Sequence, residues 1–175
     1  MITVKEAGSA DIPAIQQLAT ITWATAYASI LPQEQMSYML DLFYSTNSLQ
    51  KQMDEGHRFI MAMDSGEAVG FASWSLKADS LAVYRLHKIY IAPNQQGKGV
   101  GKSLFDFILS DIKSHNATDL ELNVNRYNKA RQFYEKIGFV VVNEEDVDIG
   151  NGYFMNDYVM NLKVSRKDAK DSQSR

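Results

Sequence analysis

A glycine-rich segment between an expected strand and an expected helix constrains the fold of this chain most strongly. The segment runs from Gln96 to Lys102 and holds three glycines within five positions. Residues 86–92 before it are apolar and rich in β-branched side chains, and Pro93 and Asn94 end that strand. After it, apolar residues recur at helical spacing from 104 to 112, which predicts a helix with one buried face.

The position of these glycines predicts a binding site for an anion. Glycine lets the backbone turn tightly and brings several N–H groups close to one ligand. The helix that follows adds the positive end of its dipole at the same point. A phosphate ester is therefore the expected ligand.

The spacing of the glycines separates three phosphate-binding motifs. A P-loop would need glycine where Gln96 stands, although Gly101-Lys102-Ser103 matches its end. The dinucleotide fingerprint fails because its last glycine would be Lys102 or Leu104. Gln96, Gly99 and Gly101 fit the pattern Gln/Arg-x-x-Gly-x-Gly/Ala, which resembles the acetyl-CoA loop of the GNAT superfamily of N-acetyltransferases. Taken alone, the loop is equally consistent with a plain structural turn.

A second segment supports the same resemblance. Residues 120–125 alternate apolar and polar side chains, which predicts a strand. A short helix is expected over 128–136, with Asn128 as its N-cap and Gly138 in a left-handed conformation after its end. The run 133–139, Phe-Tyr-Glu-Lys-Ile-Gly-Phe, resembles the second GNAT signature. With both signatures in order, the chain is identified as a member of this superfamily.

The resemblance implies a fold and a domain extent. The fold is α/β (α+β), a single GNAT-like domain over 1–164 whose mixed, mostly antiparallel sheet of about seven strands is flanked by helices. Sequence patterns predict strands at 2–5, 58–63, 68–76, 86–92, 120–125, 140–149 and 158–163. Helices are expected at 12–23, after Pro32, after a cap at Ser48, at 104–112 and at 128–136. The polar tail 165–175 is expected to be disordered.

Composition excludes several kinds of chemistry. At 175 residues and 45% hydrophobic, the chain can bury one good core. It has no cysteine, which excludes disulfides, thiolate nucleophiles and zinc–thiolate sites. Its three histidines, His57, His87 and His115, lie far apart in sequence, so no metal site is expected.

Charge and hydropathy limit the partners. The net charge of −3 does not suggest binding to nucleic acid. Residues 1–164 hold 14 basic and 19 acidic side chains, so their net charge is −5, and this negative charge favours cationic substrates. No apolar run reaches membrane-spanning length and the start does not resemble a signal peptide, so we expect a cytoplasmic protein with no membrane partner.

The resemblance implies acetyl-CoA as the co-substrate and assigns residues to it. Its pantetheine arm would pair with the backbone of Ile89, Tyr90 and Ile91, and the N–H of Ile91 is the candidate contact to the thioester oxygen. Relatives have an asparagine three residues before the helix alanine, where this chain has Tyr127, so Asn128 is a cofactor contact or only a cap. The pyrophosphate would lie on the residues Gln96, Gly97, Lys98, Gly99, Val100, Gly101, Lys102 and Ser103.

Two catalytic roles follow from the same resemblance. Tyr134 lies where the family often has its general acid, and a phenol with a pKa of about 10 can donate a proton to the departing sulfur. Ordinary core packing is the alternative for Tyr134. His87 lies where many relatives have a glutamate base, and under strict alternation it shares a face with Ile89 and Ile91. Glu121, Asn123 or water are alternatives to His87 as the base.

The outer motifs point to a class of acceptor. Residues 22–27 and 31–32, with the ending 150–153 and 157–160, resemble the PaiA-like branch, which is associated with acetylation of spermidine and spermine. Trp23, Tyr27 and Tyr153, with Tyr38 and Tyr158, would form an aromatic cleft for a cation. The acidic residues of 144–148 would attract a polyamine, although core packing and a solvated loop explain most of these residues.

Three functions are consistent with the sequence. The first is direct transfer of acetyl from acetyl-CoA to the primary amine of a small molecule, with a polyamine as one candidate. The second is acetylation of a protein or peptide amine, and the third is regulation by a CoA-binding protein without transfer activity. A homodimer is an arrangement that the sequence leaves open.

Overall fold

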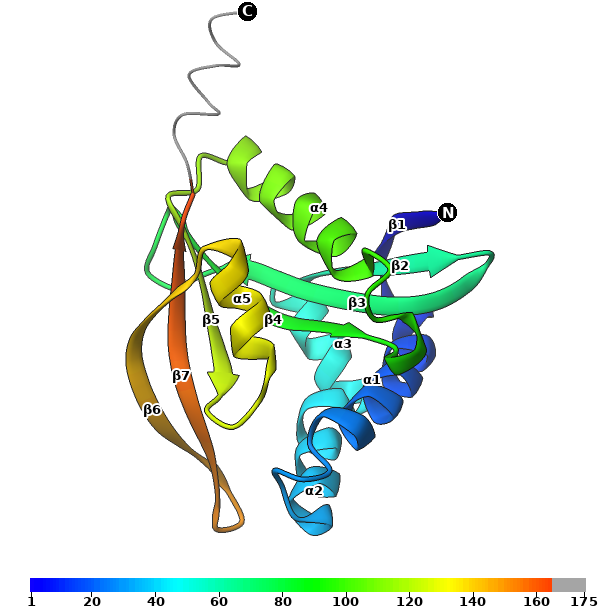
Figure 1. Cartoon of the computed structure of the whole chain (residues 1–175), viewed down its shortest axis with the longest axis vertical. Coiled ribbons are helices and arrows are strands. Elements are labelled where there is room, and N and C mark those ends of the chain that lie inside the picture. The colour runs from blue at the N-terminus through cyan, green and yellow to red at the C-terminus, as the bar shows by residue number, and fades with distance from the viewer. Residues whose placement is uncertain (165–175) are drawn as a thin grey trace, which may run out of the picture. The chain divides into compact units, whose positions relative to one another are not determined.

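The computed structural model describes residues 1–164, so the tail expected at 165–175 lies outside the described residues (Figure 1). Seven strands form one sheet in the order β1-β2-β3-β4-β5-β7-β6. They are β1 (Ile2–Ala7), β2 (Arg58–Asp64), β3 (Glu67–Leu76), β4 (Val83–Ile91), β5 (Asp119–Asn125), β6 (Val140–Gly150) and β7 (Tyr153–Lys163). The helices are α1 (Ile12–Ala26), α2 (Gln33–Tyr44), α3 (Thr46–Asp54), α4 (Val100–Ser114) and α5 (Ala130–Ile137).

The sheet is mixed, as expected. β1 with β2, β2 with β3, β5 with β7 and β6 with β7 pair antiparallel, whereas β4 and β5 run parallel. This confirms a mixed, mostly antiparallel sheet of seven strands flanked by helices. No helix among residues 1–164 is long and apolar enough to cross a membrane.

The chain forms two compact units. The first comprises Met1–Ser75 and His87–Phe107, and the second comprises Leu76–Leu86 and, of the described residues, 108–164. β4 and α4 each continue from one unit into the other, because their residues fall on both sides of these boundaries.

In the first unit, helices cover both faces of β3. Residues Val69 to Trp74 are all buried, so this strand has no solvent-exposed face there. The ring of Phe71 lies 6.1 Å from that of Tyr44 at the end of α2, and the ring of Trp74 lies 6.1 Å from that of Phe107 in α4. Because side chains alternate along a strand, α2 and α4 pack on opposite faces of β3.

Gly70 allows α4 to approach β3 and β4 closely. A Cβ at this position would lie 3.0 Å from the carbonyl oxygen of Tyr90 and 3.1 Å from Cγ1 of Val100. It would also lie 3.4 Å from Cδ1 of Leu104. Any larger residue would therefore push against the backbone of β4 and the first turns of α4.

In the second unit, the sheet has one apolar and one polar face. Leu120 and Leu122 of β5 are buried and lie opposite Leu162 and Met160 of β7. α5 packs on this face, since Gly138 after its end lies against Leu162. β6, at the edge of the sheet, is exposed along almost its whole length.

The turns and helix ends mostly follow the sequence. Ser65 and Gly66 join β2 to β3 with φ of 52° and 82°, as a tight hairpin requires, and Gly138 has φ 120° after α5. The expected cap at Ser48 is wrong. Ser45 caps α3 instead, because its side chain accepts the N–H of Ser48.

We expect Gly70→Ala to destabilise the protein, because the added methyl group meets backbone and α4 at 3.0–3.1 Å. Overpacking of this kind should lower the free energy of unfolding by about 1–3 kcal/mol, measured by chemical denaturation. Gly8→Ala is the matched control. Its Cβ meets nothing within 4 Å and its φ is −134°, so its stability should stay close to that of the wild type. Equal losses in both variants would contradict the proposed close approach.

Candidate active site

The glycine-rich loop has the conformation that its sequence predicts. After β4, a short 3-10 helix at Pro93–Gln95 leads into the loop, and α4 begins at Val100. Gly97 and Gly99 have φ of 81° and 82°, which residues with a side chain rarely adopt. A Cβ at either position would meet nothing within 4 Å, so the space beside the loop is open.

The first turn of α4 presents its N–H groups at this loop. The N–H of Ser103 donates to the carbonyl oxygen of Gly99 at 3.0 Å. The N–H groups of Val100, Gly101 and Lys102 precede this bond at the amino-terminal end of the helix, where such groups lack intrahelical acceptors. Together with the helix dipole, they suit an anion such as a pyrophosphate.

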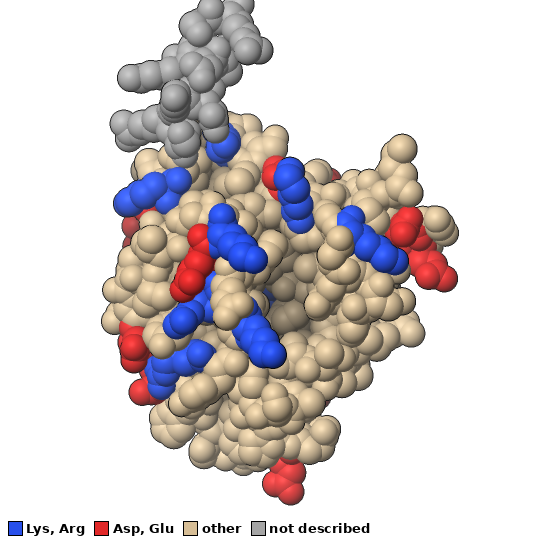
Figure 2. Space-filling model, viewed as in Figure 1, with Lys and Arg blue, Asp and Glu red and all other residues tan. Residues whose placement is uncertain are grey.

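The charged and hydroxyl side chains of the loop make local contacts. Lys102 is exposed and pairs with Asp106 at 2.7 Å, and the hydroxyl of Ser103 donates to the carbonyl oxygen of Gly99 at 3.0 Å. Lys98 is also exposed. Lysine and arginine side chains are interspersed with acidic ones on the face shown in Figure 2. The anion site is therefore built mainly from backbone groups.

The backbone of β4 presents two residues at the edge opposite β3. The N–H of Ala92 donates to Val69 of β3 at 2.9 Å, and the carbonyl oxygen of Tyr90 lies beside Gly70. Because backbone groups alternate along a strand, those of Ile89 and Ile91 point away from β3. β4 pairs with β5 only from Val83 to Leu86. Ile89 and Ile91 therefore lie beyond the last residue of β4 that pairs with β5. The geometry favours Ile89 and Ile91, over Tyr90, for backbone contacts to a ligand.

His87 and Lys88 depart from strict alternation. Nε2 of His87 lies 2.7 Å from the hydroxyl of Ser75, and Nζ of Lys88 donates to Oε1 of Gln52 in α3 at 2.9 Å. Both contacts lie on the face covered by α2 and α3, since Ser75 is on the same face of β3 as Phe71. The expectation that strict alternation sets the face of His87 is wrong, because consecutive residues reach one face.

Lys88 is a cation that sequence reasoning missed. Its ammonium lies 5.2 Å from the ring centroid of Tyr44 and 5.9 Å from that of Phe59. Burial lowers the pKa of Lys88 to about 8. A single lysine in an apolar strand was the only available signal in the sequence.

Tyr134 and Asn128 belong to the second unit. Tyr134 is buried in α5, and its ring lies 5.7 Å from that of Phe139 in an edge-on arrangement. Oδ1 of Asn128 accepts the N–H of Ala130 at 2.9 Å, so this side chain supports the start of α5. The helix itself begins at Ala130 rather than at 128. The roles of Tyr134 as acid and of Asn128 as cofactor contact stay predictions.

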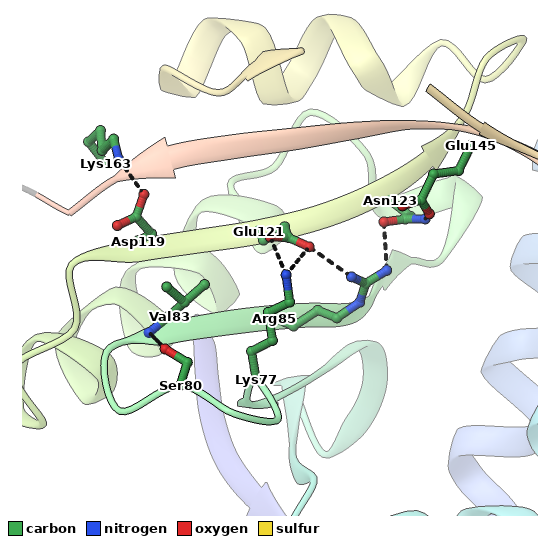
Figure 3. A network of polar contacts seen from close by, with 9 residues as sticks. All are labelled: Lys77, Ser80, Val83, Arg85, Asp119, Glu121, Asn123, Glu145 and Lys163. Atoms are coloured by element: carbon green, nitrogen blue, oxygen red, sulfur yellow. Dashed lines mark hydrogen bonds and ion pairs between the residues drawn. The ribbon is translucent and has the colours of Figure 1, made fainter. Parts of the chain in front are cut away.

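Glu121 and Asn123 lie in a network of polar contacts on the sheet (Figure 3). Glu121 pairs with both Lys77 and Arg85 at 3.0 Å, and Arg85 also donates to Oδ1 of Asn123 at 2.6 Å. The amide nitrogen of Asn123 donates to Glu145 at 3.2 Å. The carboxylate of Glu121 is thus held by two ion pairs, and its role as a base stays a prediction.

The same amide of Asn123 reaches a carboxylate that the sequence did not single out. It donates to Oδ2 of Asp157 at 3.3 Å, and Asp157 is only 2% exposed. Burial raises the pKa of Asp157, and the negative charge of Glu145 adds to this, while the bond from Asn123 opposes it. No group of three His, Asp or Glu side chains within residues 1–164 is placed to hold a metal ion.

The aromatic residues expected at a substrate cleft divide between the units. Trp23 and Tyr27 are 4% and 8% exposed, with ring centroids 4.8 Å apart, so they form part of the core of the first unit. The ring of Trp23 also lies 6.1 Å from that of Tyr90. Tyr153 begins β7 in the second unit. Contact of these residues with a substrate stays a prediction.

The fold and the loop suit a protein that binds an anionic co-substrate such as coenzyme A, and comparison with known proteins identifies the family. The model of the acetyltransferase (GNAT) domain matches residues 28–161, which is more than half of the chain. The chain therefore belongs to the GNAT family. It is an acetyl-CoA-dependent N-acetyltransferase.

Two characterised relatives cover most of the chain. The [ribosomal protein bS18]-alanine N-acetyltransferase of Haemophilus influenzae is 29% identical over 121 residues, 69% of this chain and 76% of that protein. The spermidine N(1)-acetyltransferase of Thermoplasma acidophilum is 25% identical over 160 residues, 88% of this chain and 95% of that protein.

Solved structures share the fold. The PaiA N-acetyltransferase from Thermoplasma acidophilum, in complex with coenzyme A, matches with a TM-score of 0.79 and 24% identity, covering 93% of this chain and 99% of that one. The ribosomal-protein-S18-alanine N-acetyltransferase from Escherichia coli matches with a TM-score of 0.70 and 19% identity, covering 94% and 95%.

We expect Gly99→Ala to weaken binding of coenzyme A. An alanine at this position disfavours φ 82°, so the free loop would adopt another conformation. Returning the loop to the binding conformation would cost about 1 kcal/mol, which corresponds to a roughly fivefold loss of affinity. Calorimetry would measure this loss. Gly66→Ala is the matched control, because Gly66 also has φ 82° and an open Cβ position but lies in the β2–β3 hairpin. It should lose stability and keep its affinity. Unchanged affinity in Gly99→Ala would contradict a role for the loop conformation.

Proposed function

We propose that the protein transfers the acetyl group of acetyl-CoA directly to a primary amine of a small molecule, with a polyamine as the first candidate. The observation that carries the acceptor class is the match to a spermidine N(1)-acetyltransferase over 88% of this chain and 95% of that protein. The body charge of −5 also favours a cationic acceptor. A cytoplasmic location stays a prediction.

Backbone groups would hold the co-substrate. When bound, acetyl-CoA supplies the acetyl group as an activated thioester. The loop from Gln96 to Lys102 and the hydroxyl of Ser103 would bind the pyrophosphate, and Ile89 and Ile91 would bind the pantetheine arm as an added strand. The N–H of Ile91 would donate to the thioester oxygen as negative charge develops on it.

His87 would accept the proton that the acceptor must lose. An alkylammonium has a pKa of about 10.4, and only the neutral amine attacks a thioester. A free imidazole has a pKa of about 6.5, so a neutral imidazole at His87 would be able to take this proton. No covalent enzyme intermediate is needed.

Tyr134 would donate a proton to the departing thiolate. A free thiol has a pKa of about 8.5, so a phenol that is still protonated at neutral pH can assist its departure. Trp23, Tyr27 and Tyr153 would contribute aromatic surface for the acceptor. Two of these are nearly buried, so their contribution would be to shape the site rather than to contact a large ligand.

A second candidate function is acetylation of the amino terminus of a protein. It is favoured by the 29% identity to the bS18-alanine N-acetyltransferase, the higher of the two identities given above. The two functions differ in the acceptor alone, so one panel of amines separates them.

We expect release of thiol from acetyl-CoA to depend on spermidine or spermine, measured with a colorimetric thiol reagent. The chain has no cysteine, so every thiol detected comes from CoA. The panel should include amino acids, aminoglycosides, lysine peptides and a peptide that begins with alanine. Release with peptides alone would replace the small-molecule proposal by the second candidate. No release with any amine, together with binding of acetyl-CoA, would favour a regulatory CoA-binding protein.

We expect Tyr134→Phe to lower kcat about 100-fold while binding of coenzyme A stays unchanged, since only the proton donor is lost. Tyr127→Phe is the matched control. It removes the same hydroxyl from a side chain that is 70% exposed in the same unit, and its kcat should match the wild type. A Tyr134→Phe enzyme with full kcat would rule out the general-acid role.

A further inference from the structure

Two histidines that lie 30 positions apart in the sequence stack on each other in the first unit. The imidazole rings of His57 and His87 have centroids 4.1 Å apart and planes that differ by 2°. Nε2 of His87 lies 2.7 Å from the hydroxyl of Ser75, so one ring face and one ring nitrogen of His87 are in contact with other side chains. The structure therefore fixes the plane of this imidazole.

The position of His57 is set by the end of α3. Gly56, with φ 100°, turns the chain back, and the N–H of His57 donates to the carbonyl oxygen of Gln52 at 2.9 Å. The side-chain oxygen of the same glutamine accepts a hydrogen bond from the ammonium group of Lys88 at 2.9 Å. Gln52 thus holds both His57 and a cation in one small region.

We propose that His57 is a positioning residue for His87: its ring holds the His87 imidazole on Ser75 and stays neutral, so that a proton taken up by the pair resides on His87. The proposal rests on the proposed function in one respect, the role of His87 as the base. Beyond that function, the proposal names His57 as the residue that orients the base. It also gives a reason why His87, and not His57, carries the proton.

Charge and burial around His57 keep it neutral. Two stacked imidazoles repel each other strongly when both are protonated. Burial lowers the pKa of His57, the positive charge of Lys88 lowers it further, and Glu55 opposes this. Nδ1 of His57 is buried and has no hydrogen-bond partner among residues 1–164. An imidazolium there would leave a charged N–H without an acceptor.

Ser75 suits either state of His87. The Nε2–H of a neutral His87 donates to the hydroxyl of Ser75, and it still donates after the ring takes up a proton at Nδ1, so the bond of 2.7 Å persists in both states. When the acceptor amine loses its proton, the N–H bond breaks, the electron pair stays on the amine nitrogen, and the proton joins Nδ1 of His87. His87 needs no rotation to receive it, because His57 and Ser75 hold the ring.

The test is a titration of the histidine side chains by ¹H–¹⁵N NMR on the whole protein without substrate. The chain has three histidines, and His115, which is exposed, serves as an internal reference. We expect His87 to protonate first on acidification and His57 at least about one pH unit lower. In Lys88→Met, the pKa of His57 should rise toward that of His87. Protonation of His57 before His87 in the wild type would overturn the proposal.

Two substitutions separate positioning from simple support of the fold. In His57→Ala the stack is lost, and we expect kcat to fall roughly tenfold with KM nearly unchanged. In His57→Phe a flat ring remains without a titratable group, and kcat should recover to within about twofold of the wild type. Full kcat in a folded His57→Ala enzyme, or no recovery in a folded His57→Phe enzyme, would overturn the positioning role.

Failure of the inference and failure of the proposed function give different results. A wild-type protein that acetylates no amine would count against the proposed function, whereas the order of protonation is read without any substrate. If His87→Gln abolishes transfer but His57→Ala does not affect it, His87 is the base and the inference alone is wrong.

Discussion

The close approach of α4 to the sheet at Gly70 is the constraint on which the anion site depends. The backbone of β4 and the first turn of α4 both lie near 3 Å from the position of a Cβ at this residue. The start of the helix, and so its exposed N–H groups, is thereby held at a fixed place relative to the end of β4. The bond from Ala92 to Val69 joins the end of β4 to β3 next to Gly70. Backbone geometry, rather than any charged side chain, positions the groups that we propose bind the pyrophosphate.

Features that depend on local backbone conformation were predictable from the sequence. Gly138 has the left-handed φ that its position predicted, and the tight turn predicted for the glycine-rich loop uses positive φ at Gly97 and Gly99, which glycine adopts at little cost. The tight turn between the strands predicted at 58–63 and 68–76 likewise has positive φ, at Ser65 and Gly66. The mixed sheet of seven strands agrees with the family resemblance, which was based on two separate motifs in the expected order.

Contacts between distant residues were not predictable in the same way. The stack of His57 on His87 depends on a turn after α3 and on two consecutive residues of β4 that reach one face. A pattern that assumes alternation misses such a departure. Glu121 was a candidate base because it lies on a polar strand face. Lys77 and Arg85 form ion pairs with it, and both come from other segments of the chain, which a periodic pattern within one strand does not identify. These ion pairs could therefore not be predicted from the sequence pattern, and the identity of the base stays a prediction.

Burial of Lys88 beside His57 and His87 lowers the stability of the folded protein at neutral pH, so a contribution to stability does not account for a lysine at this position. Its pKa of about 8 lies below the value of an unfolded lysine, so the unfolded chain binds more protons between about pH 8 and pH 10.4. Stability from this group therefore rises with pH across that window, and at neutral pH its burial as a cation is unfavourable. The rings of Tyr44 and Phe59 and the amide of Gln52 offset part of this cost.

A methionine of similar length would fill the same space without burying a charge. What the lysine adds is a positive charge beside two stacked imidazoles, which lowers the pKa of His57. The position of the proton within the pair then depends on a cation that destabilises the fold at neutral pH. A cost in stability next to a candidate base is the pattern expected where a site is arranged for proton transfer.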